Sequence, residues 1–389
     1  MRLSDARDQV LEAADRLLQA GMIARTWGNI SCRVDENHFI ITPSGRDYKS
    51  LSPEELVIVN ISDGRSWGDI RPSSEVGIHR SGYAHHPDTN FIIHTHQPEA
   101  SVLSAIGIDI VRDEADLGHF SDIPCAEYGF PGSDELRRNV EAALDGERNR
   151  MALMAHHGAI CLGKSCMEAL RFVALLEMMS TCYIQNAFGK LIGCDIAPDD
   201  ILYDRLMEHC FGLTFPRTYR PLCKSERRGD IIHYHLPNGR TQRLRMDDSA
   251  LVAEQRIHRE IYKARPDIAA ITHCVTPSAL AYSLLKQPLG TYLDDFAQIN
   301  GVEMQWAPME EEAVVEALGD NHGVLLENNG ALCCGNSLYD AEALAMVLEK
   351  NARSFLISKI FPNHPIQEVP RAECEKMREF YLQSYSKRF

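Results

Sequence analysis

Residues 75–80 read Glu-Val-Gly-Ile-His-Arg, and residues 254–259 read Glu-Gln-Arg-Ile-His-Arg. A Pro-Asp pair follows each of these segments at the same offset, and a polar run follows each pair, again in step. The two runs are His94-Thr95-His96-Gln97-Pro98 and His273-Cys274-Val275-Thr276-Pro277. Matches that stay in register along a chain indicate an internal repeat. The sequence therefore predicts two copies of one domain.

The repeat continues downstream of these segments. Residues 155–163 read Ala-His-His-Gly-Ala-Ile-Cys-Leu-Gly, and residues 327–335 read Glu-Asn-Asn-Gly-Ala-Leu-Cys-Cys-Gly. This places the junction between the copies somewhere in residues 195–222. We expect a first, catalytic domain over residues 1–205 and a second, degenerate domain over residues 206–389.

Local patterns within the first copy predict both helices and strands. Apolar residues at helical spacing predict a helix over residues 5–20, and a second helix is expected over 73–85. Residues 52–55, Ser-Pro-Glu-Glu, have the cap, proline and acid of a compact helix start. A buried strand begins at 91–93, and a long capped helix is expected over 165–188. The mixture predicts an α/β fold, with helices on the faces of one sheet.

Composition narrows the class of protein. The chain has 389 residues and a net charge of −15, so nucleic acid is a poor partner, because phosphate binding needs a basic face. No apolar run approaches the ~18 residues of a membrane span. The cysteines are scattered without a CxxC pair, which is typical of reduced cytosolic thiols. We therefore expect a cytoplasmic protein that spans no membrane.

Three histidines and a glutamate form the candidate metal site. His94 and His96 lie two apart on the predicted strand, so both point to the same face. His157 supplies a third imidazole, and Gly158 after it permits a sharp turn. Glu75 begins the preceding helix and can reach a metal or a substrate proton. The set favours an open divalent-metal site, most simply zinc, over satisfied core or surface histidines.

The second copy lacks this set of ligands. Val275 stands where the first copy has His96, and Asn329 stands where it has His157. Only His273 and Glu254 remain, and one imidazole with one carboxylate rarely holds zinc. We expect the second copy to be free of metal and to keep a packing role.

Three short polar elements precede the metal motif. Each pairs small or hydroxyl-bearing residues that let backbone N–H groups approach an anion. The elements are Gly28-Asn29, Ser44-Gly45 and Ser73-Ser74, the last at a predicted helix N-terminus. Together they can cradle a phosphate without lysine or arginine, although each alone could equally be a turn or a cap.

Taken as a set, these motifs resemble the class II aldolase/adducin family, in tandem duplicate. The resemblance rests on Gly28-Asn29-Ile30-Ser31, Thr42-Pro43-Ser44-Gly45, Ser73-Ser74-Glu75, His94-Thr95-His96, Ile123-Pro124-Cys125 and His157-Gly158. It implies two domains, each a central mixed, largely antiparallel sheet flanked by helices. It also implies a divalent metal, most simply Zn²⁺, on His94, His96, His157 and Glu75, with Glu75 as proton carrier. Phosphate binding by Gly28, Asn29, Ser44, Gly45, Ser73 and Ser74 is likewise implied.

The activity that the resemblance implies is cleavage of a phosphorylated ketose. The products are dihydroxyacetone phosphate and an aldehyde, formed through a metal-stabilised enediolate. A sugar-phosphate 4-epimerase is the first alternative, and a non-catalytic scaffold similar to adducin is the second. A dehydratase or decarboxylase on the same scaffold also stays open.

The family also implies rings of four domains with active sites between neighbours. A duplicated chain then predicts a homodimer that forms a pseudo-fourfold ring. Related aldolases place a tyrosine in the loop after the HxH motif, but residues 104–122 contain none. That loop carries Asp116, and epimerases place an acidic residue there. Tyr292 in the second copy's loop could serve a neighbouring site, or it could be a packed tyrosine.

Overall fold

The chain forms two compact units. The computed structural model describes residues 1–111, 122–146, 149–193, 199–216, 218–220, 223–236, 238–249 and 251–385. The first unit comprises Met1–Ala187 with Phe361–Gln367, and the second comprises Phe188–Ile360 with Glu368–Lys387. Each unit is described below by itself.

The first unit is built on an eight-stranded sheet. The strands are β1 (Asn29–Arg33), β2 (His38–Ile41), β3 (Val57–Asn60), β4 (Ser66–Trp67), β5 (Phe91–Thr95), β6 (Cys125–Ala126), β7 (Met151–Met154) and β8 (Gly158–Gly163). Their order across the sheet is β4-β3-β2-β1-β5-β8-β7-β6. Neighbours are antiparallel except β6 and β7, which are parallel. The sheet is thus mixed and largely antiparallel, with β5 near its centre.

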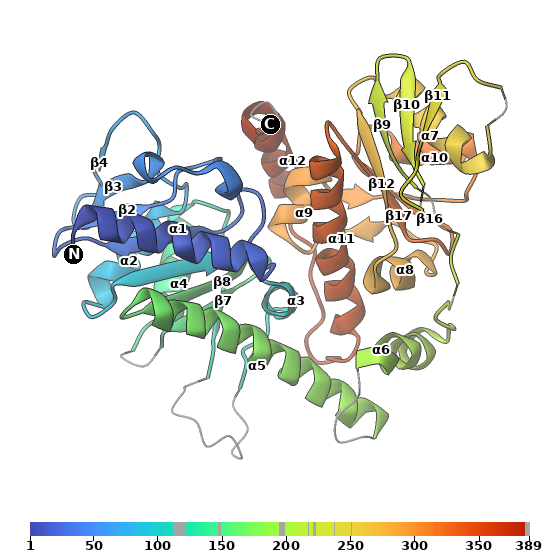
Figure 1. Cartoon of the computed structure of the whole chain (residues 1–389). Coiled ribbons are helices and arrows are strands. Elements are labelled where there is room, and N and C mark those ends of the chain that lie inside the picture. The colour runs from blue at the N-terminus through green and yellow to red at the C-terminus, as the bar shows by residue number, and fades with distance from the viewer. Residues whose placement is uncertain are drawn as a thin grey trace. The chain divides into compact units, whose positions relative to one another are not determined.

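Helices cover this sheet (Figure 1). They are α1 (Leu3–Gln19), α2 (Val76–His85), α3 (Pro98–Ile106), α4 (Asp134–Ala143) and α5 (Cys166–Ile192). Helices α2 and α4 share one apolar core with the sheet, in which Ile78 and Leu136 pack with Phe39 and Ile92. Short 3₁₀ turns lie at Tyr48–Ser50 and Pro53–Glu55, between β2 and β3. Burying one stripe of each helix against the sheet places the N-terminus of α2 beside the end of β5.

The second unit repeats this topology. Its strands are β9 (Lys224–Arg228), β10 (Ile231–His235), β11 (Thr241–Arg245), β12 (Ala270–Cys274), β15 (Trp306–Ala307), β16 (Gly323–Leu326) and β17 (Ala331–Gly335), with a separate pair β13 (Leu289–Gly290) and β14 (Glu303–Met304). The seven-stranded order is β11-β10-β9-β12-β17-β16-β15, which matches β3-β2-β1-β5-β8-β7-β6 of the first unit strand for strand. The parallel pair is again at the corresponding edge, between β15 and β16. The expected fold class, two tandem α/β units, is confirmed.

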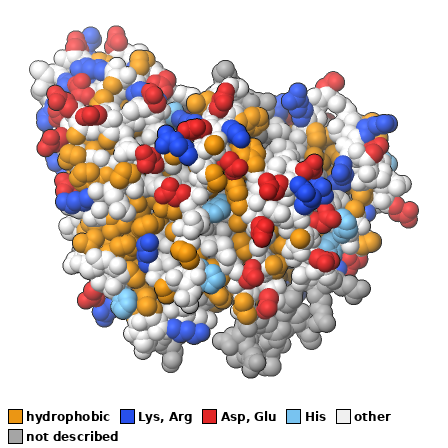
Figure 2. Space-filling model, turned by 180° about the vertical axis from the view of Figure 1, so that it is seen from behind, with side chains coloured by type: hydrophobic (Ala, Val, Ile, Leu, Met, Phe, Trp, Pro, Cys, Tyr) orange, Lys and Arg blue, Asp and Glu red, His pale blue; other side chains and the backbone are white. Residues whose placement is uncertain are grey.

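The second unit also contains helices. They are α6 (Asp199–Leu206), α7 (Ala253–Ala264), α8 (Pro277–Ser283), α9 (Asp294–Ile299), α10 (Glu311–Leu318), α11 (Leu338–Ser358) and α12 (Arg371–Phe380), with single π turns at Met207–Phe211 and Tyr381–Tyr385. Helices α7 and α10 pack against the sheet through Ile257, Ile261 and Val314. Within the described residues, no helix is long and apolar enough to cross a membrane. Figure 2 shows acidic and basic side chains interspersed with apolar ones over one face of the chain.

Candidate metal centre

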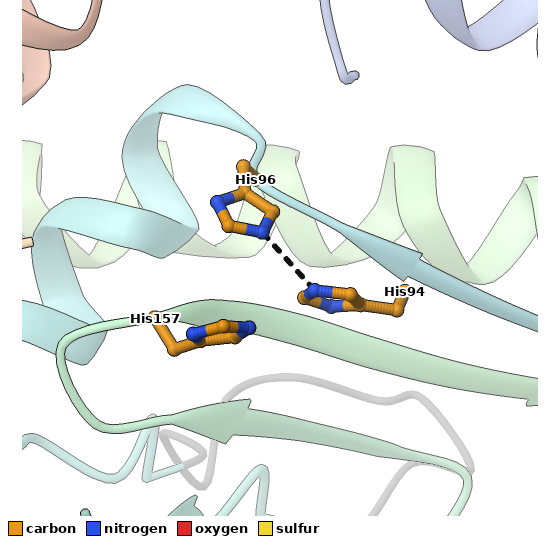
Figure 3. A group of neighbouring side chains, drawn as sticks. All are labelled: His94, His96 and His157. Atoms are coloured by element: carbon orange, nitrogen blue, oxygen red, sulfur yellow. Dashed lines mark hydrogen bonds between the residues drawn. The ribbon is translucent and has the colours of Figure 1, made fainter. Parts of the chain in front are cut away.

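Three imidazoles from separate positions in the chain meet in the first unit. His94 lies on β5, His96 follows the end of that strand, and His157 lies in the turn between β7 and β8 (Figure 3). All three are buried, and one ligand nitrogen from each lies within 4.8 Å of the others. The Nε2 atoms of His94 and His96 are 3.1 Å apart. The structure thus brings together the three histidines that the sequence selected.

Strand pairing sets the orientation of His94. The Nδ1 atom of His94 lies 2.9 Å from the backbone carbonyl oxygen of Ala159 on β8. A carbonyl only accepts, so Nδ1 carries the proton and donates it. When the ring is neutral, its Nε2 lone pair therefore faces His96 and His157, which is the tautomer that a metal ligand needs.

The turn that carries His157 has its sharpest bend one residue earlier. We expected Gly158 to permit a sharp turn, and the residue of this turn with positive φ is His156, at 62°. Gly158 is required for a different reason, because a Cβ atom there would lie 2.3 Å from the carbonyl oxygen of Thr95. The absence of a side chain lets β8 approach β5 closely enough for His157 to reach His94.

Glu75 completes the cluster. Its two carboxylate oxygens lie 2.8 Å from His157 Nε2 and 3.3 Å from His94 Nε2, and the side chain is only 7% exposed. Burial alone would raise the pKa of Glu75, but His94 and His157 hold that pKa well below its usual range. The carboxylate is therefore ionised beside the imidazoles.

The chemistry of this donor set fits a divalent transition metal. Three buried imidazoles and one carboxylate are ligands that zinc and similar ions accept. Two of the imidazoles also stack, with the ring centroids of His94 and His157 5.0 Å apart. An ion held by His94, His96 and His157 would neutralise the charge of Glu75 and keep room for substrate oxygens.

The three polar elements of the candidate phosphate cradle lie around Glu75. Ser73 donates its N–H to the carbonyl of Thr42, which brings the Ser44-Gly45 turn beside the start of α2. Ser73 also accepts the N–H of Glu75 through its hydroxyl at 3.2 Å. Ser73 and Gly45 are buried, Ser44 is half-buried and Ser74 is exposed. The elements are close in space, as a shared anion site requires.

Gly28 and Asn29 lie at the start of β1, next to His94. Gly28 has φ of 84°, and a Cβ atom there would lie 2.7 Å from the His94 carbonyl oxygen. The Asn29 amide donates to Glu75 Oε2 at 2.6 Å. This contact was not expected from the sequence, which assigned Asn29 to phosphate binding alone.

Two further buried polar residues, Ser31 and Tyr83, lie next to this cluster, and neither was assigned a role in the site from the sequence. The hydroxyl of Ser31 contacts His79 Nδ1 at 2.6 Å and the Tyr83 hydroxyl at 2.8 Å. Burial lowers the pKa of His79 to about 3, so its ring is neutral. The repeat could have indicated Tyr83. This tyrosine lies eight residues after Glu75, and Tyr262 lies eight residues after Glu254.

The corresponding place in the second unit is filled by the chain itself. The Arg220 guanidinium pairs with Glu254, the counterpart of Glu75. The Asn329 amide, at the His157 position, accepts from the Arg220 N–H at 2.8 Å and donates to the Arg220 carbonyl at 3.0 Å. His273 contacts the Asn329 carbonyl oxygen at 2.7 Å. Among the described residues, the only three-residue metal-ligand cluster is that of the first unit.

The structure describes one of the two accessory candidates, Tyr292, but not the other. Asp116 lies outside the described residues. Tyr292 is buried in the second unit, where its ring packs on Phe355 with centroids 5.8 Å apart. Its service to a neighbouring site stays a prediction, and it would require the ring to leave this packing.

These observations define the class of protein: a duplicated α/β chain with a buried cluster of histidines and a carboxylate in its first unit. The chain belongs to the Class II Aldolase and Adducin N-terminal domain family, which it matches over residues 8–184 and again over 223–356. The predicted family is confirmed, and the two matched regions agree with the tandem duplication.

Relatives of known name match about half of this chain. It is 31% identical over 194 residues to 5-methylthioribulose-1-phosphate/5-deoxyribulose-1-phosphate aldolase of Rhodospirillum rubrum, covering 49% of this chain and 86% of that protein. It is 28% identical over 179 residues to L-fuculose phosphate aldolase of Escherichia coli K12, covering 45% and 81%. A solved L-fuculose 1-phosphate aldolase aligns with a TM-score of 0.44 and 26% identity, over 54% of this chain and 97% of that one. The relatives are aldolases, so the chain falls among the carbon–carbon lyases.

Proposed function

We propose that the first unit is a metal-dependent aldolase that cleaves a phosphorylated ketose to dihydroxyacetone phosphate and an aldehyde. The observation that carries the proposal is the Glu75 carboxylate, held 2.8 Å and 3.3 Å from two of the three clustered imidazoles. The names of the relatives support the same reaction class and phosphorylated substrates.

Each group of residues has a separate task in this proposal. His94, His96 and His157 would hold the ion, for which we propose Zn²⁺, together with Glu75. When bound, such an ion supplies Lewis acidity to a substrate carbonyl. Glu75 moves the proton on the carbon next to that carbonyl, and its buried setting excludes competing water.

The phosphate would lie in the cradle around the start of α2. Backbone N–H groups at Gly28, Gly45 and Ser74, with the hydroxyls of Ser44 and Ser73, provide donors without a fixed positive side chain. Asn29 has already given one N–H to Glu75, so only its second amide hydrogen is left for phosphate. The cradle therefore anchors the end of the substrate that is not cleaved.

The second unit would be catalytically silent in this scheme. Its place for an ion is closed by Arg220, and it retains only one of the three imidazoles. We propose that it packs with the first unit of a partner chain in a homodimeric, pseudo-fourfold ring. Light scattering tests this, and a monomer would contradict it. The cytoplasmic location expected from the sequence stays a prediction.

The function is tested with purified protein, Zn²⁺ and a panel of phosphorylated ketoses. The panel includes 5-methylthioribulose 1-phosphate, 5-deoxyribulose 1-phosphate and L-fuculose 1-phosphate, and released dihydroxyacetone phosphate is assayed. Glu75→Gln keeps an acceptor for Asn29 but removes the proton carrier, so we expect roughly a 10²–10⁴-fold loss of kcat. Glu254→Gln is the matched control and should leave the rate unchanged. If the protein instead converts a pentulose phosphate to its 4-epimer without cleaving it, the aldolase proposal is wrong and the protein is an epimerase.

A further inference from the structure

A continuous chain of hydrogen bonds runs through the first unit to Glu75. Its buried members, in order, are Tyr83, Ser31, His79, Asn29 and Glu75. Tyr83 to Ser31 is 2.8 Å, Ser31 to His79 Nδ1 is 2.6 Å, His79 Nε2 to Asn29 Oδ1 is 2.5 Å, and Asn29 Nδ2 to Glu75 Oε2 is 2.6 Å. The chain links the interior of α2 to the carboxylate beside the three imidazoles.

The direction of every bond follows from the chemistry of the groups. A carboxylate only accepts, so Asn29 must present its NH₂ to Glu75 and its carbonyl oxygen to His79. His79 must then carry its proton on Nε2 and accept at Nδ1. Ser31 therefore donates to His79, and its oxygen accepts from Tyr83. One arrangement satisfies all members, and the carboxylate at the Glu75 end fixes it.

We propose that His79 is a positioning residue for Glu75, acting through the side-chain amide of Asn29. His79 Nε2–H locks the amide so that its NH₂, and not its oxygen, faces the carboxylate. With the amide turned over, an oxygen would face Glu75 Oε2 at hydrogen-bond distance, and the carboxylate would have to move. This inference rests on the proposed function, because Glu75 is the proton carrier there.

The second unit provides an internal comparison. Ser225 contacts His258 Nδ1 at 2.8 Å and the Tyr262 hydroxyl at 2.8 Å, which repeats the Ser31–His79–Tyr83 arrangement. Cys223 stands two residues before Ser225, where the first unit has Asn29. In the part of the chain that the structure describes, His258 Nε2 has no hydrogen-bond partner.

The comparison separates two roles. A Ser–His–Tyr arrangement present in both units holds the second helix of the repeat against the sheet. The continuation through Asn29 to a carboxylate is found in the unit with the histidine cluster and not in the described part of the other. A variant of His258 therefore reports the packing cost, and a variant of His79 reports packing together with positioning.

The test uses the full chain with matched variants in the two units. The variants His79→Leu and Ser31→Ala interrupt the series of hydrogen bonds that leads to Glu75. The variants His258→Leu and Ser225→Ala are their controls in the second unit. His79→Gln is the conservative variant, because a glutamine amide can still donate to Asn29. Thermal unfolding first checks that each pair is folded, and Ser31→Ala keeps the test valid if His79→Leu does not fold. Steady-state kinetics and titration of the metal-free protein with Co²⁺, followed by its visible absorption, are then measured.

We expect His79→Leu to lower kcat roughly 10–100-fold and to weaken Co²⁺ binding roughly tenfold, with a smaller rise in KM because Asn29 also offers an amide hydrogen to the phosphate. Ser31→Ala should shift both in the same direction, His79→Gln should recover part of the loss, and both controls should leave kcat and Co²⁺ affinity unchanged. Equal effects of His79→Leu and His258→Leu on kcat and Co²⁺ affinity would overturn the inference, as would unchanged values in His79→Leu. If wild-type protein cleaves no ketose phosphate but His79→Leu still weakens Co²⁺ binding, the proposed function fails and the inference stands.

Discussion

Replacing His96 by alanine tests the metal site most directly. The His96 Nε2 atom lies 3.1 Å from His94 Nε2, and the ring is 7% exposed, so the substitution removes one of three converging ligands from a buried site. Two imidazoles and Glu75 remain, and the mutated side is left open to water. His273→Ala is the matched control, because His273 is the counterpart of His94 in the unit that Arg220 closes.

The size of the effect follows from linkage between metal binding and folding. An ion at about 1,000 times its Kd stabilises the folded state by about 4.1 kcal/mol. For a unit of this size, each kcal/mol raises Tm by about 2–4 °C. Adding Zn²⁺ to metal-free wild-type protein should therefore raise the Tm of the first unit by roughly 8–16 °C. His96→Ala should lose most of this increment, and His273→Ala should retain it.

Scanning calorimetry of metal-free protein, with and without Zn²⁺, measures the increment in all three proteins. Metal content after gel filtration gives an independent count of bound ions. A full Tm increment in His96→Ala would refute the assignment of the ligand, since two imidazoles would then suffice. Loss of the increment in His273→Ala alone would place the ion in the second unit and refute the whole scheme.

Three further predictions concern packing, charge and pH. Gly158→Ala would place a Cβ atom 2.3 Å from the Thr95 carbonyl oxygen, so we expect a loss of about 1–3 kcal/mol by urea unfolding, together with weaker metal binding. Arg220→Leu removes the cationic partner of Glu254, and since that arginine is 56% exposed, we expect a loss of only about 1 kcal/mol, with no gain of metal binding. Burial lowers the pKa of His258 to about 3, so between about pH 6.5 and 3 the unfolded chain binds the proton and the folded chain does not. Folded stability is lost as the pH falls through that window, and His258→Leu should reduce the slope by about 1.4 kcal/mol per pH unit.

Each of these has a control and a contrary outcome. Gly77→Ala adds a Cβ atom 3.3 Å from Arg137 Cδ inside a helix, and it should be neutral or stabilising. Equal stability of Gly158→Ala and Gly77→Ala would contradict the close-approach argument. Uptake of one additional Zn²⁺ by Arg220→Leu would show that Arg220, and not the missing imidazoles, excludes the ion. An unchanged acid slope in His258→Leu would mean that this histidine titrates normally in the folded chain.

The sequence predicted the helices better than the short turns. The helix expected over 5–20 is α1, Leu3–Gln19, and the long capped helix is α5, in which Glu168 N–H donates to the Ser165 hydroxyl at 3.2 Å. Residues 52–55 form their capping box but produce only a 3₁₀ turn, Pro53–Glu55. The turn stops there because Leu56 is extended and β3 begins at Val57, so sheet pairing prevails over the local signal.

The histidine cluster was predictable because His94 and His96 lie two residues apart, a spacing that places both side chains on one face of the predicted strand. Contacts that depend on side-chain direction were not predictable in the same way. The Asn29–Glu75 bond joins residues far apart in sequence, and Arg220 comes from the linker before the second sheet, outside the repeated pattern. A linker has no repeat partner, so no comparison within the chain could indicate where its side chains go.

Arg220 shows why a degenerate site cannot simply lose its ligands. Glu254 is 16% exposed in its side chain, and a carboxylate in such a setting needs a compensating charge or hydrogen bonds. In the first unit that charge would come from an ion, which Glu75 and the imidazoles are arranged to hold. In the second unit the Arg220 guanidinium faces the corresponding carboxylate, Glu254. The side-chain amide of Asn329 holds Arg220 in place by bonding to both its backbone N–H and its backbone carbonyl. The two units thus compensate two corresponding carboxylates in different ways, and in the first unit an ion on the imidazoles would leave coordination positions for substrate oxygens.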